Sequence, residues 1–363
     1  MSARQAGAAL AAAMGIGRFV YTPILPLMTA QAGLSATGAA SLATANYLGY
    51  FVGALATIVR APSRATNRWA LVLLVVTLAG MPLTHSFAAW FVLRLVAGVA
   101  SAVVFVAAVN AGPGWGLSGV GLGIALSGVI VLVRAEWGFA WWVAAGVSAL
   151  LTAVAWRMQP KGPAPQLPPG GNEEIHTRPW STRPNRREFA ALLAAYTLEG
   201  VGYIIAGTFL VAAISGPLGT LSWVLVGASA ALSPALVKLG GRYLLPAVFA
   251  VQAVGIALPA LVGGTVAALI AVTLFGATFL TIAGITLKTG AGLGFPRSAA
   301  ILTTGYSAGQ IIGPLVATPV LHHGYHDALL LAAAIVLTAL APLSRLPAVT
   351  RTPPRRTPAE LVE

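Results

Sequence analysis

The chain has 363 residues, of which 58% are hydrophobic and only 8% charged, with a mean hydropathy of +0.86 and a formal net charge of +13. This composition excludes an ordinary soluble domain. The Lys and Arg residues lie between apolar blocks and form no basic face with interleaved aromatics, which argues against a nucleic-acid partner. The absence of cysteine excludes disulfides and thiolate-bound metals.

Apolar stretches about one bilayer long follow one another along the whole chain. Each must be helical, because lipid offers no partner for backbone N–H and C=O groups. The first begins almost at Met1 and lacks a small-residue cleavage site, so we expect it to be retained as a span. The sequence predicts an all-α membrane protein with twelve transmembrane helices, at 6–29, 39–59, 69–86, 88–109, 118–133, 138–157, 189–213, 220–237, 243–262, 265–287, 298–320 and 327–345.

One long polar segment, rich in Pro and Arg, separates the sixth span from the seventh. It predicts an N-terminal six-helix bundle over 1–158, a cytoplasmic linker over 159–187, a C-terminal six-helix bundle over 188–346 and a cytoplasmic tail over 347–363. If the N-terminus is inside, 18 of the 21 Lys and Arg residues fall in cytoplasmic segments. The positive-inside rule therefore places both termini in the cytoplasm, with Lys238, Arg242 and Lys288 as anchors at the cytoplasmic ends of spans.

Glycines at matching places suggest that the halves are copies of one another. Gly-x-Gly pairs occur at 15 and 17 in the first span and at 200 and 202 in the seventh. Small residues four apart allow close contact between helix backbones, and we expect this packing role for Gly119 and Gly123 of the fifth span and for Gly305, Gly309 and Gly313 of the eleventh. Parallel six-helix repeats are typical of one large class of transporters.

Several runs together resemble a known family over nearly the whole chain. They include 15–19 with Tyr21, Pro23 and Pro26, then 43–50, 119–128, 202–204 followed by 208–209, and 309–314. In these runs the chain resembles the major facilitator superfamily, within it the YbfB/YjiJ-type branch. Arg94, with Gly98 four residues on, resembles the fourth-helix motif whose arginine is associated with proton coupling, although Ala97 stands where a polar residue is frequent. The acidic and Gly-Arg pattern usual between the second and third helices is absent from 60–68.

Charges inside the spans are the sharpest functional signals, because an ionised side chain at the bilayer centre costs about 3 kcal/mol. Arg18 lies half way along the first span, where it faces either the central cavity or buried backbone carbonyls. Arg94 lies near enough to the outer end of its span to reach the surface instead. Glu199 is the one acidic residue within the predicted spans and the leading proton-binding candidate, unless its helix begins later and leaves it solvated.

Polar and aromatic residues could line a cavity or hold helices together. Asn46 and Tyr50 share a face of the second span, Tyr47 lies beside them, and Tyr203 and Gln310 occupy corresponding regions of spans seven and eleven. With Arg18, these five residues form the predicted substrate-binding set.

Other apparent motifs do not lie in the structural context that their chemistry needs. The Gly-x-Ser-x-Gly pattern at 305–309 resembles a hydrolase elbow but lies in a glycine-faced membrane helix. His322, His323, His326 and Asp327 could be drawn as a metal site, yet Gly324 interrupts their spacing, so we expect no metal. No Walker loop or nucleotide fingerprint occurs, and we expect no cofactor.

The sequence predicts a monomeric secondary transporter of a bacterial inner or plasma membrane, working by alternating access and driven by protons. Arg18 favours an anionic or carboxylate-bearing substrate, whereas an apolar cavity around Glu199 would suit export of amphipathic or cationic compounds. A membrane-embedded enzyme would need clustered catalytic groups and a non-transporting sensor an appended soluble domain. Neither feature is found in the sequence, so we do not expect an enzyme.

Overall fold

The computed structural model describes residues 3–111, 114–159, 185–212, 217–241, 243–323 and 325–346. Every regular element within these ranges is a helix, which confirms the predicted all-α class. Eleven helical segments there are long and apolar enough to cross a membrane. Most of the predicted linker, at 160–184, and the predicted tail at 347–363 lie outside the described residues.

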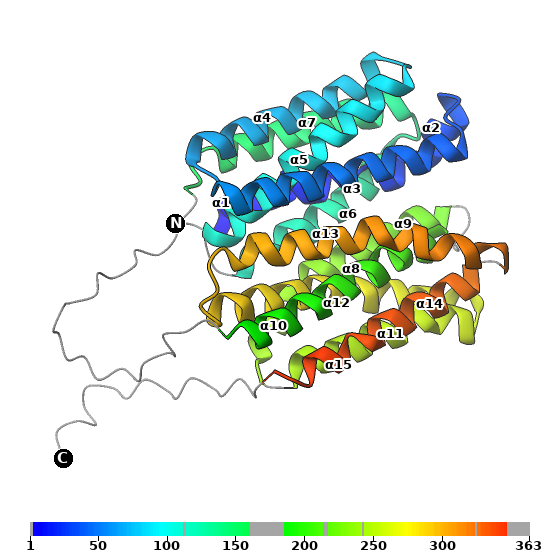
Figure 1. Ribbon diagram of the computed structural model, residues 1–363. Coiled ribbons are helices and arrows are strands. Elements are labelled where there is room, and N and C mark those ends of the chain that lie inside the picture. Colours follow the sequence, from blue (N-terminus) through cyan, green and yellow to red (C-terminus); the bar gives the residue numbers. More distant parts are fainter. Residues whose placement is uncertain are drawn as a thin grey trace.

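The N-terminal half of the chain forms the helices drawn at the top of Figure 1. They are α1 (Ala3–Leu10), the π-helix η1 (Ala11–Ile16), α2 (Tyr21–Gln31), α3 (Ala36–Val59), α4 (Arg64–Gly80), η2 (Met81–Leu83), α5 (Phe87–Ala111), η3 (Gly114–Leu117), α6 (Ser118–Val133) and α7 (Trp137–Ala155).

The C-terminal half forms the helices drawn below them (Figure 1). They are α8 (Arg186–Ala212), α9 (Pro217–Ala231), α10 (Ser233–Leu239), α11 (Leu244–Leu261), α12 (Gly264–Gly292), α13 (Ser298–Ala317), η4 (Thr318–His323), α14 (Tyr325–Thr338) and α15 (Leu340–Leu343).

Three predicted spans differ in character from what the sequence suggested. The first is not one regular helix, because a π-helix and a turn interrupt it between Ala11 and Val20. The predicted eleventh span is α13, which has 20 residues but is not among the eleven segments of sufficient apolarity. Its polar side chains, including those of Thr303, Ser307 and Gln310, lower its mean hydropathy. They do not meet lipid, because they are buried inside the protein. The predicted twelfth span consists of α14 and α15.

Large apolar side chains cover the outer faces of the helices. Trp69 is 73% exposed, Leu150 71% and Val266 72%. A soluble protein rarely presents so many large apolar groups to water, whereas lipid tails accept them at no cost. Together with the eleven apolar helices, this makes the chain a multi-pass membrane protein.

The two halves meet along α6 and α9 and along α3 and α13 (Figure 1). Trp223 Nε1 of α9 donates to Ser127 Oγ of α6 at 3.1 Å. At another point of contact, Arg297 at the start of α13 donates through Nη1 to the carbonyls of Ile58 and Val59 at the end of α3. The last carbonyls of a helix have no partner within it, so this guanidinium caps α3 from the other half.

Candidate functional site

The first span is broken at its centre, next to Arg18. At the end of the π-helix, Gly17 N donates to Ala12 O and Phe19 N donates to Met14 O, each five residues earlier in the chain. Thr22 N then bonds Phe19 O, so the carbonyls of Gly17 and Arg18 receive no backbone hydrogen bond within the described residues. A carbonyl left unpaired in the membrane costs several kcal/mol. The break therefore needs partners from elsewhere.

Arg94 of α5 supplies those partners. Its Nη1 donates to Gly17 O at 3.2 Å and its Nη2 to Arg18 O at 3.0 Å. The guanidinium also lies 4.8 Å from the centre of the Tyr21 ring, and the side chain is 3% exposed. The planar, forked guanidinium presents two separate nitrogens to the two adjacent carbonyls, whereas a lysine presents one. In this structure Arg94 holds the broken backbone in place and contacts no carboxylate.

The Arg18 side chain points from the break toward the other half of the protein. Its Nη2 donates to Gln310 Oε1 of α13. Its Cζ lies 4.0 Å from the centre of the Tyr50 ring and 5.5 Å from those of Tyr47 and Phe19. Arg18 is 3% exposed, and its Nε and Nη1 have no hydrogen-bond partner in the described structure. A buried guanidinium with two unpaired nitrogens is incomplete without an acceptor.

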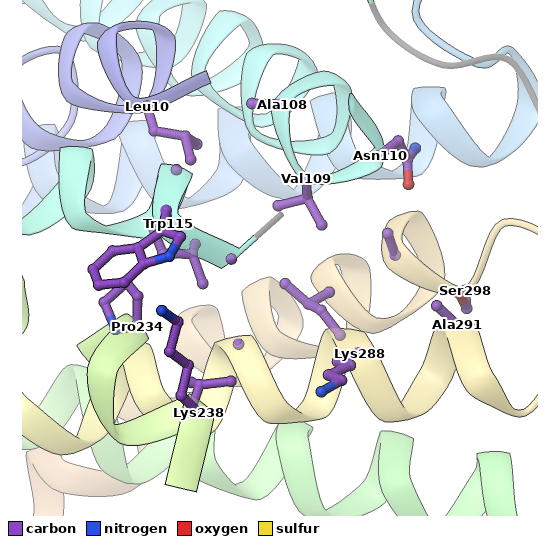
Figure 2. Close-up of a pocket in the computed structure, with 17 residues that line it drawn as sticks. Leu10, Ala108, Val109, Asn110, Trp115, Pro234, Lys238, Lys288, Ala291 and Ser298 are labelled. Atoms are coloured by element: carbon purple, nitrogen blue, oxygen red, sulfur yellow. The ribbon is translucent and has the colours of Figure 1, made fainter. Parts of the chain in front are cut away.

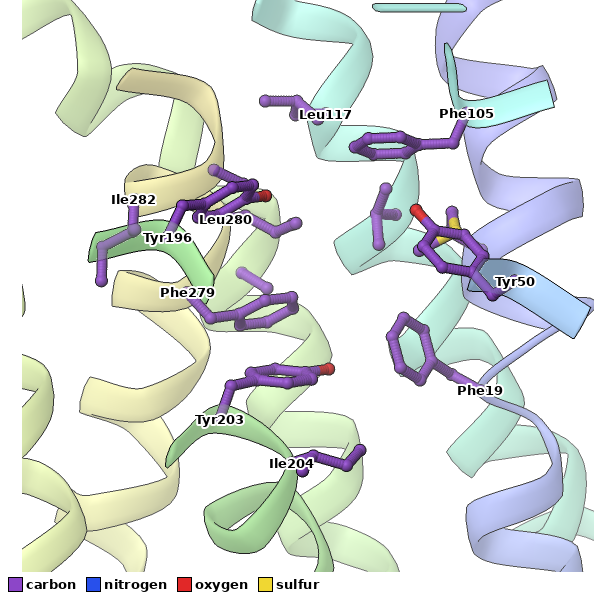
Figure 3. Packing of buried hydrophobic residues seen from close by; sticks show 14 of the residues in the cluster. Phe19, Tyr50, Phe105, Leu117, Tyr196, Tyr203, Ile204, Phe279, Leu280 and Ile282 are labelled. Atoms are coloured by element: carbon purple, nitrogen blue, oxygen red, sulfur yellow. The ribbon is translucent and has the colours of Figure 1, made fainter. Parts of the chain in front are cut away.

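The aromatic side chains around Arg18 come from both halves. Figure 3 shows Phe19, Tyr50 and Phe105 facing Tyr203 and Phe279 across the space between the two sets of helices. Tyr203 stacks on Phe275 with ring centres 5.3 Å apart and packs against Tyr306 at 5.6 Å. These rings form the apolar surroundings of the Arg18 side chain.

Glu199 belongs to α8 of the C-terminal half and is fully buried. Its Oε1 accepts a hydrogen bond from Gln252 Nε2 of α11 at 3.1 Å. The Tyr306 ring lies beside the same carboxyl group, and Oε2 has no hydrogen bond of good geometry to any described residue. Burial without a cation or a full set of donors favours the protonated form of a carboxyl group.

The predicted substrate-binding residues do not all lie together. Arg18, Tyr47, Tyr50 and Gln310 form one cluster, in which Gln310 Nε2 is unpaired. Tyr203 belongs to the facing aromatic layer. Asn46 instead donates through Nδ2 to Arg94 O at 3.0 Å, which joins α3 to α5.

Sequence reasoning missed Gln252, Phe19 and Tyr306. Gln252 had a readable signal, because it is a lone amide in the middle of the predicted ninth span. The two aromatic residues had none, since aromatic side chains in membrane helices mostly face lipid or the interface.

The five glycines predicted to allow close packing lie at helix contacts. A Cβ on Gly123 would fall 2.7 Å from Gly15 Cα, and one on Gly119 would meet the Gly7 backbone. In the other half, Gly305, Gly309 and Gly313 of α13 face α8, where a Cβ on Gly309 would lie 2.9 Å from Val201 N. The first span thus packs on α6, and α8 packs on α13.

No metal-binding group of three or more His, Asp or Glu side chains occurs among the described residues. The side chains of His322 and His323 lie outside that part of the structure, so the expected absence of a metal there is untested.

Comparisons with known proteins agree on the family and the fold. The family model of the uncharacterised MFS-type transporter YbfB matches residues 10–343, the branch that the sequence resembles. No curated protein sequence matches the chain. Among solved structures, the human organic anion transporter MFSD10 (TETRAN) is similar, with a TM-score of 0.67 and 14% identity over 94% of this chain and 100% of that chain. At this identity the likeness shows the fold alone.

Proposed function

Because the chain belongs to the MFS family described by the uncharacterised transporter YbfB, and is therefore a membrane transporter, we propose that it is a secondary active transporter of a small organic anion, coupled to protons. We place it as a monomer in a bacterial inner or plasma membrane, with both termini in the cytoplasm. Two six-helix bundles, 1–158 and 188–346, would alternate access to a site between them.

The unpaired guanidinium of Arg18 carries the anion proposal. Its Nε and Nη1 are buried without an acceptor at the contact between the halves, while Nη2 bonds Gln310 of the opposite half. A carboxylate between the halves would accept hydrogen bonds from the N–H groups of the guanidinium that are still without an acceptor. Tyr47, Tyr50 and Gln310 would orient the rest of the substrate. The solved relative named as an organic anion transporter is consistent with this class, but its low identity adds little weight.

Glu199 supports proton coupling. It is fully buried, bonded to Gln252 and beside Tyr306, and has no basic partner within 4 Å among the described residues. A carboxyl group in such a place can take up a proton in one conformation and release it in another that admits water. Proton-coupled transport of this kind requires no cofactor and no metal.

The aromatic residues near Glu199 favour a second candidate. Tyr196, Tyr203 and Tyr306 pack against one another and are electrostatic neighbours of the Glu199 carboxyl group, and aromatic faces attract cations. Export of an amphipathic cation bound near Glu199 is therefore the alternative to anion transport.

Uptake assays on purified protein in lipid vesicles test both proposals. Metabolite profiling of cells with and without the protein supplies the leading compounds, which are then offered with and without an imposed pH gradient. Gradient-driven movement of an anion that requires Arg18 supports the proposal, with Arg134→Ala as the control because that outer arginine pairs with Glu136. Transport of a cation that survives Arg18→Ala would favour the alternative, and a signal indifferent to the gradient would remove proton coupling.

A further inference from the structure

A cavity of about 620 Å³ lies between the halves (Figure 2), and no residue of the Arg18 cluster lines it. One wall comes from Leu10 of α1, Val109 of α5 and Trp115 of η3. The other comes from Lys238 of α10 and Lys288 of α12. All of these belong to the helix ends that the positive-inside rule places toward the cytoplasm. The volume is that of a small-molecule site.

The charge of this cavity is entirely positive among the described residues. Lys238 and Lys288 line it, and none of the four described acidic residues, Glu136, Glu188, Glu199 and Asp327, does so. The one ion pair in the described part of the chain joins Arg134 to Glu136 and lies elsewhere. Both ammonium groups are thus without a described carboxylate.

Lys238 is held toward the cavity by a contact between the halves. Its Nζ lies 4.2 Å from the centre of the Trp115 ring, and Figure 2 shows the lysine directed toward the indole. A lysine serving only as an anchor at the membrane surface would extend outward to the headgroups. A cation–π contact is weak at an exposed site, so an incoming anion can share or replace it.

The remaining walls are mostly apolar, with Leu10, Val109, Leu117, Val237 and Leu287 among them. A cavity lined by two lysines and by apolar walls matches a ligand that has one anionic end and one apolar end. We propose that this cavity is a second binding site, for an amphipathic anion bearing a carboxylate or phosphate. This inference rests on the proposed function in one respect: the anion would be the transported substrate, bound temporarily between the cytoplasm and Arg18.

The position of the cavity along the first span fits a temporary binding site on the way to Arg18. Leu10 precedes Arg18 by eight residues, which is at most about 12 Å along the span, because the π-helix between them rises less per residue than a regular α-helix. The two sites are therefore close enough to exchange one anion. The same chemistry could instead hold the headgroup of an anionic phospholipid, so the test must separate the two sources.

Cysteine labelling tests the proposal directly, because the chain contains no cysteine. Ala291→Cys places one thiol on the cavity wall, and Ala61→Cys places one at an exposed position outside it. In nanodiscs of phosphatidylcholine, phenyl phosphate should slow maleimide labelling at 291 and leave labelling at 61 unchanged. Benzylamine, of similar size but positive, should not protect. Equal protection by benzylamine, or none by phenyl phosphate, would overturn a soluble-anion site.

Removing Lys238 and Lys288 is the second part of the experiment. In the Lys238→Gln/Lys288→Gln variant the concentration of phenyl phosphate that gives half protection should rise about tenfold. Unchanged size-exclusion and thermal profiles would show that the variant is folded. Undiminished protection in that folded variant would overturn the role of the lysines.

Lipid composition separates the two sources of the anion. If the occupant is a headgroup, labelling at 291 should already be slow in nanodiscs containing phosphatidylglycerol without any added probe, and the double variant should relieve it. If phosphatidylglycerol has no effect while phenyl phosphate protects, the occupant is soluble. Either result supports an anion site, and the absence of both effects overturns it.

Arg18→Ala distinguishes this inference from the proposed function. Protection at 291 should persist in that variant while transport is lost. Loss of protection in Arg18→Ala would show that the cavity is no separate site. Persistent protection with normal transport would instead defeat the proposed role of Arg18 and leave the cavity site standing.

Discussion

Arg94 Nη2 donates to the backbone carbonyl of Arg18 at 3.0 Å, so one buried arginine holds the chain from which the other extends. Its Nη1 takes the neighbouring carbonyl of Gly17. Arg18 can therefore direct its side chain at the opposite half only because its backbone has left the regular helix and Arg94 has bonded the freed carbonyls. π-Helical segments occur often at functional sites, and here the segment ends one residue before Gly17.

This relationship predicts the behaviour of Arg94 variants. Arg94→Ala should abolish transport and lower the free energy of unfolding by about 2 kcal/mol, because two carbonyls lose charged donors. Arg94→Lys should recover little of either, since one ammonium nitrogen would replace the two guanidinium nitrogens that reach the separate carbonyls. Thermal denaturation in detergent, with Arg134→Ala as the control, measures the loss. If Arg94→Ala keeps its stability and loses only gradient-driven accumulation, the role in proton coupling that the family resemblance implies would be correct instead.

Arg18 should behave in the opposite way. Arg18→Ala removes a buried charge with two unpaired nitrogens, so abundance and thermal stability should remain close to those of the native chain. Transport of the main substrate should disappear. Arg18→Lys should rescue poorly if the substrate makes a two-pronged carboxylate contact. Vesicle uptake and membrane abundance are the measurements, and normal uptake by Arg18→Ala would remove Arg18 from the substrate site.

Glu199 should separate coupling from transport. Glu199→Gln keeps the shape of the side chain and an oxygen for Gln252 Nε2, but it cannot exchange a proton. Accumulation driven by a pH gradient should vanish, while exchange of substrate across the membrane without net proton movement should survive. Glu188→Gln in the first turn of the same helix is the matched control. If the Glu199→Gln protein still concentrates substrate in response to pH, the proton is carried elsewhere, and loss of both activities would indicate a structural glutamate.

The glycine contacts predict a pair of contrasting alanine variants. A Cβ on Gly123 would meet Gly15 Cα at 2.7 Å and Ala11 O at 2.8 Å, whereas one on Gly146 of α7 would meet nothing within 4 Å. Gly123→Ala should therefore destabilise the protein by about 1–3 kcal/mol and displace the broken first span, whereas Gly146→Ala should be neutral. Thermal denaturation of both variants decides this. Equal midpoints would mean that α6 can move away from the first span at little cost.

The distribution of loop charges predicts the orientation of the chain in the membrane. Reporters fused after Glu363 or inserted within 160–187 should be cytoplasmic, and one within 322–326 should be external. Labelling with a membrane-impermeant reagent in intact cells measures this. External labelling of the 160–187 insertion would reverse the orientation and place the two-lysine cavity on the outside.

The sequence by itself determined the class of protein, the helices and the family. A long apolar stretch must cross lipid as a helix, because the backbone has no other hydrogen-bond partners there. The approximate positions of the spans therefore follow from where the apolar stretches lie in the sequence. It also identified Arg18, Arg94 and Glu199, since a charge inside a span is costly and needs a reason. The paired glycines were readable because they recur at matching places in the two halves.

Only the tertiary structure decided which partners these residues have. Periodicity and hydropathy carry no sign of the π-helix, which depends on Arg94 arriving from another helix to bond the carbonyls of Gly17 and Arg18. Likewise, Asn46 bonds the α5 backbone and does not join Arg18, whereas Gln252 reaches Glu199 from 53 residues away. The energy of a buried polar group depends on what surrounds it in space, and contacts between distant segments are absent from a linear pattern of residue types.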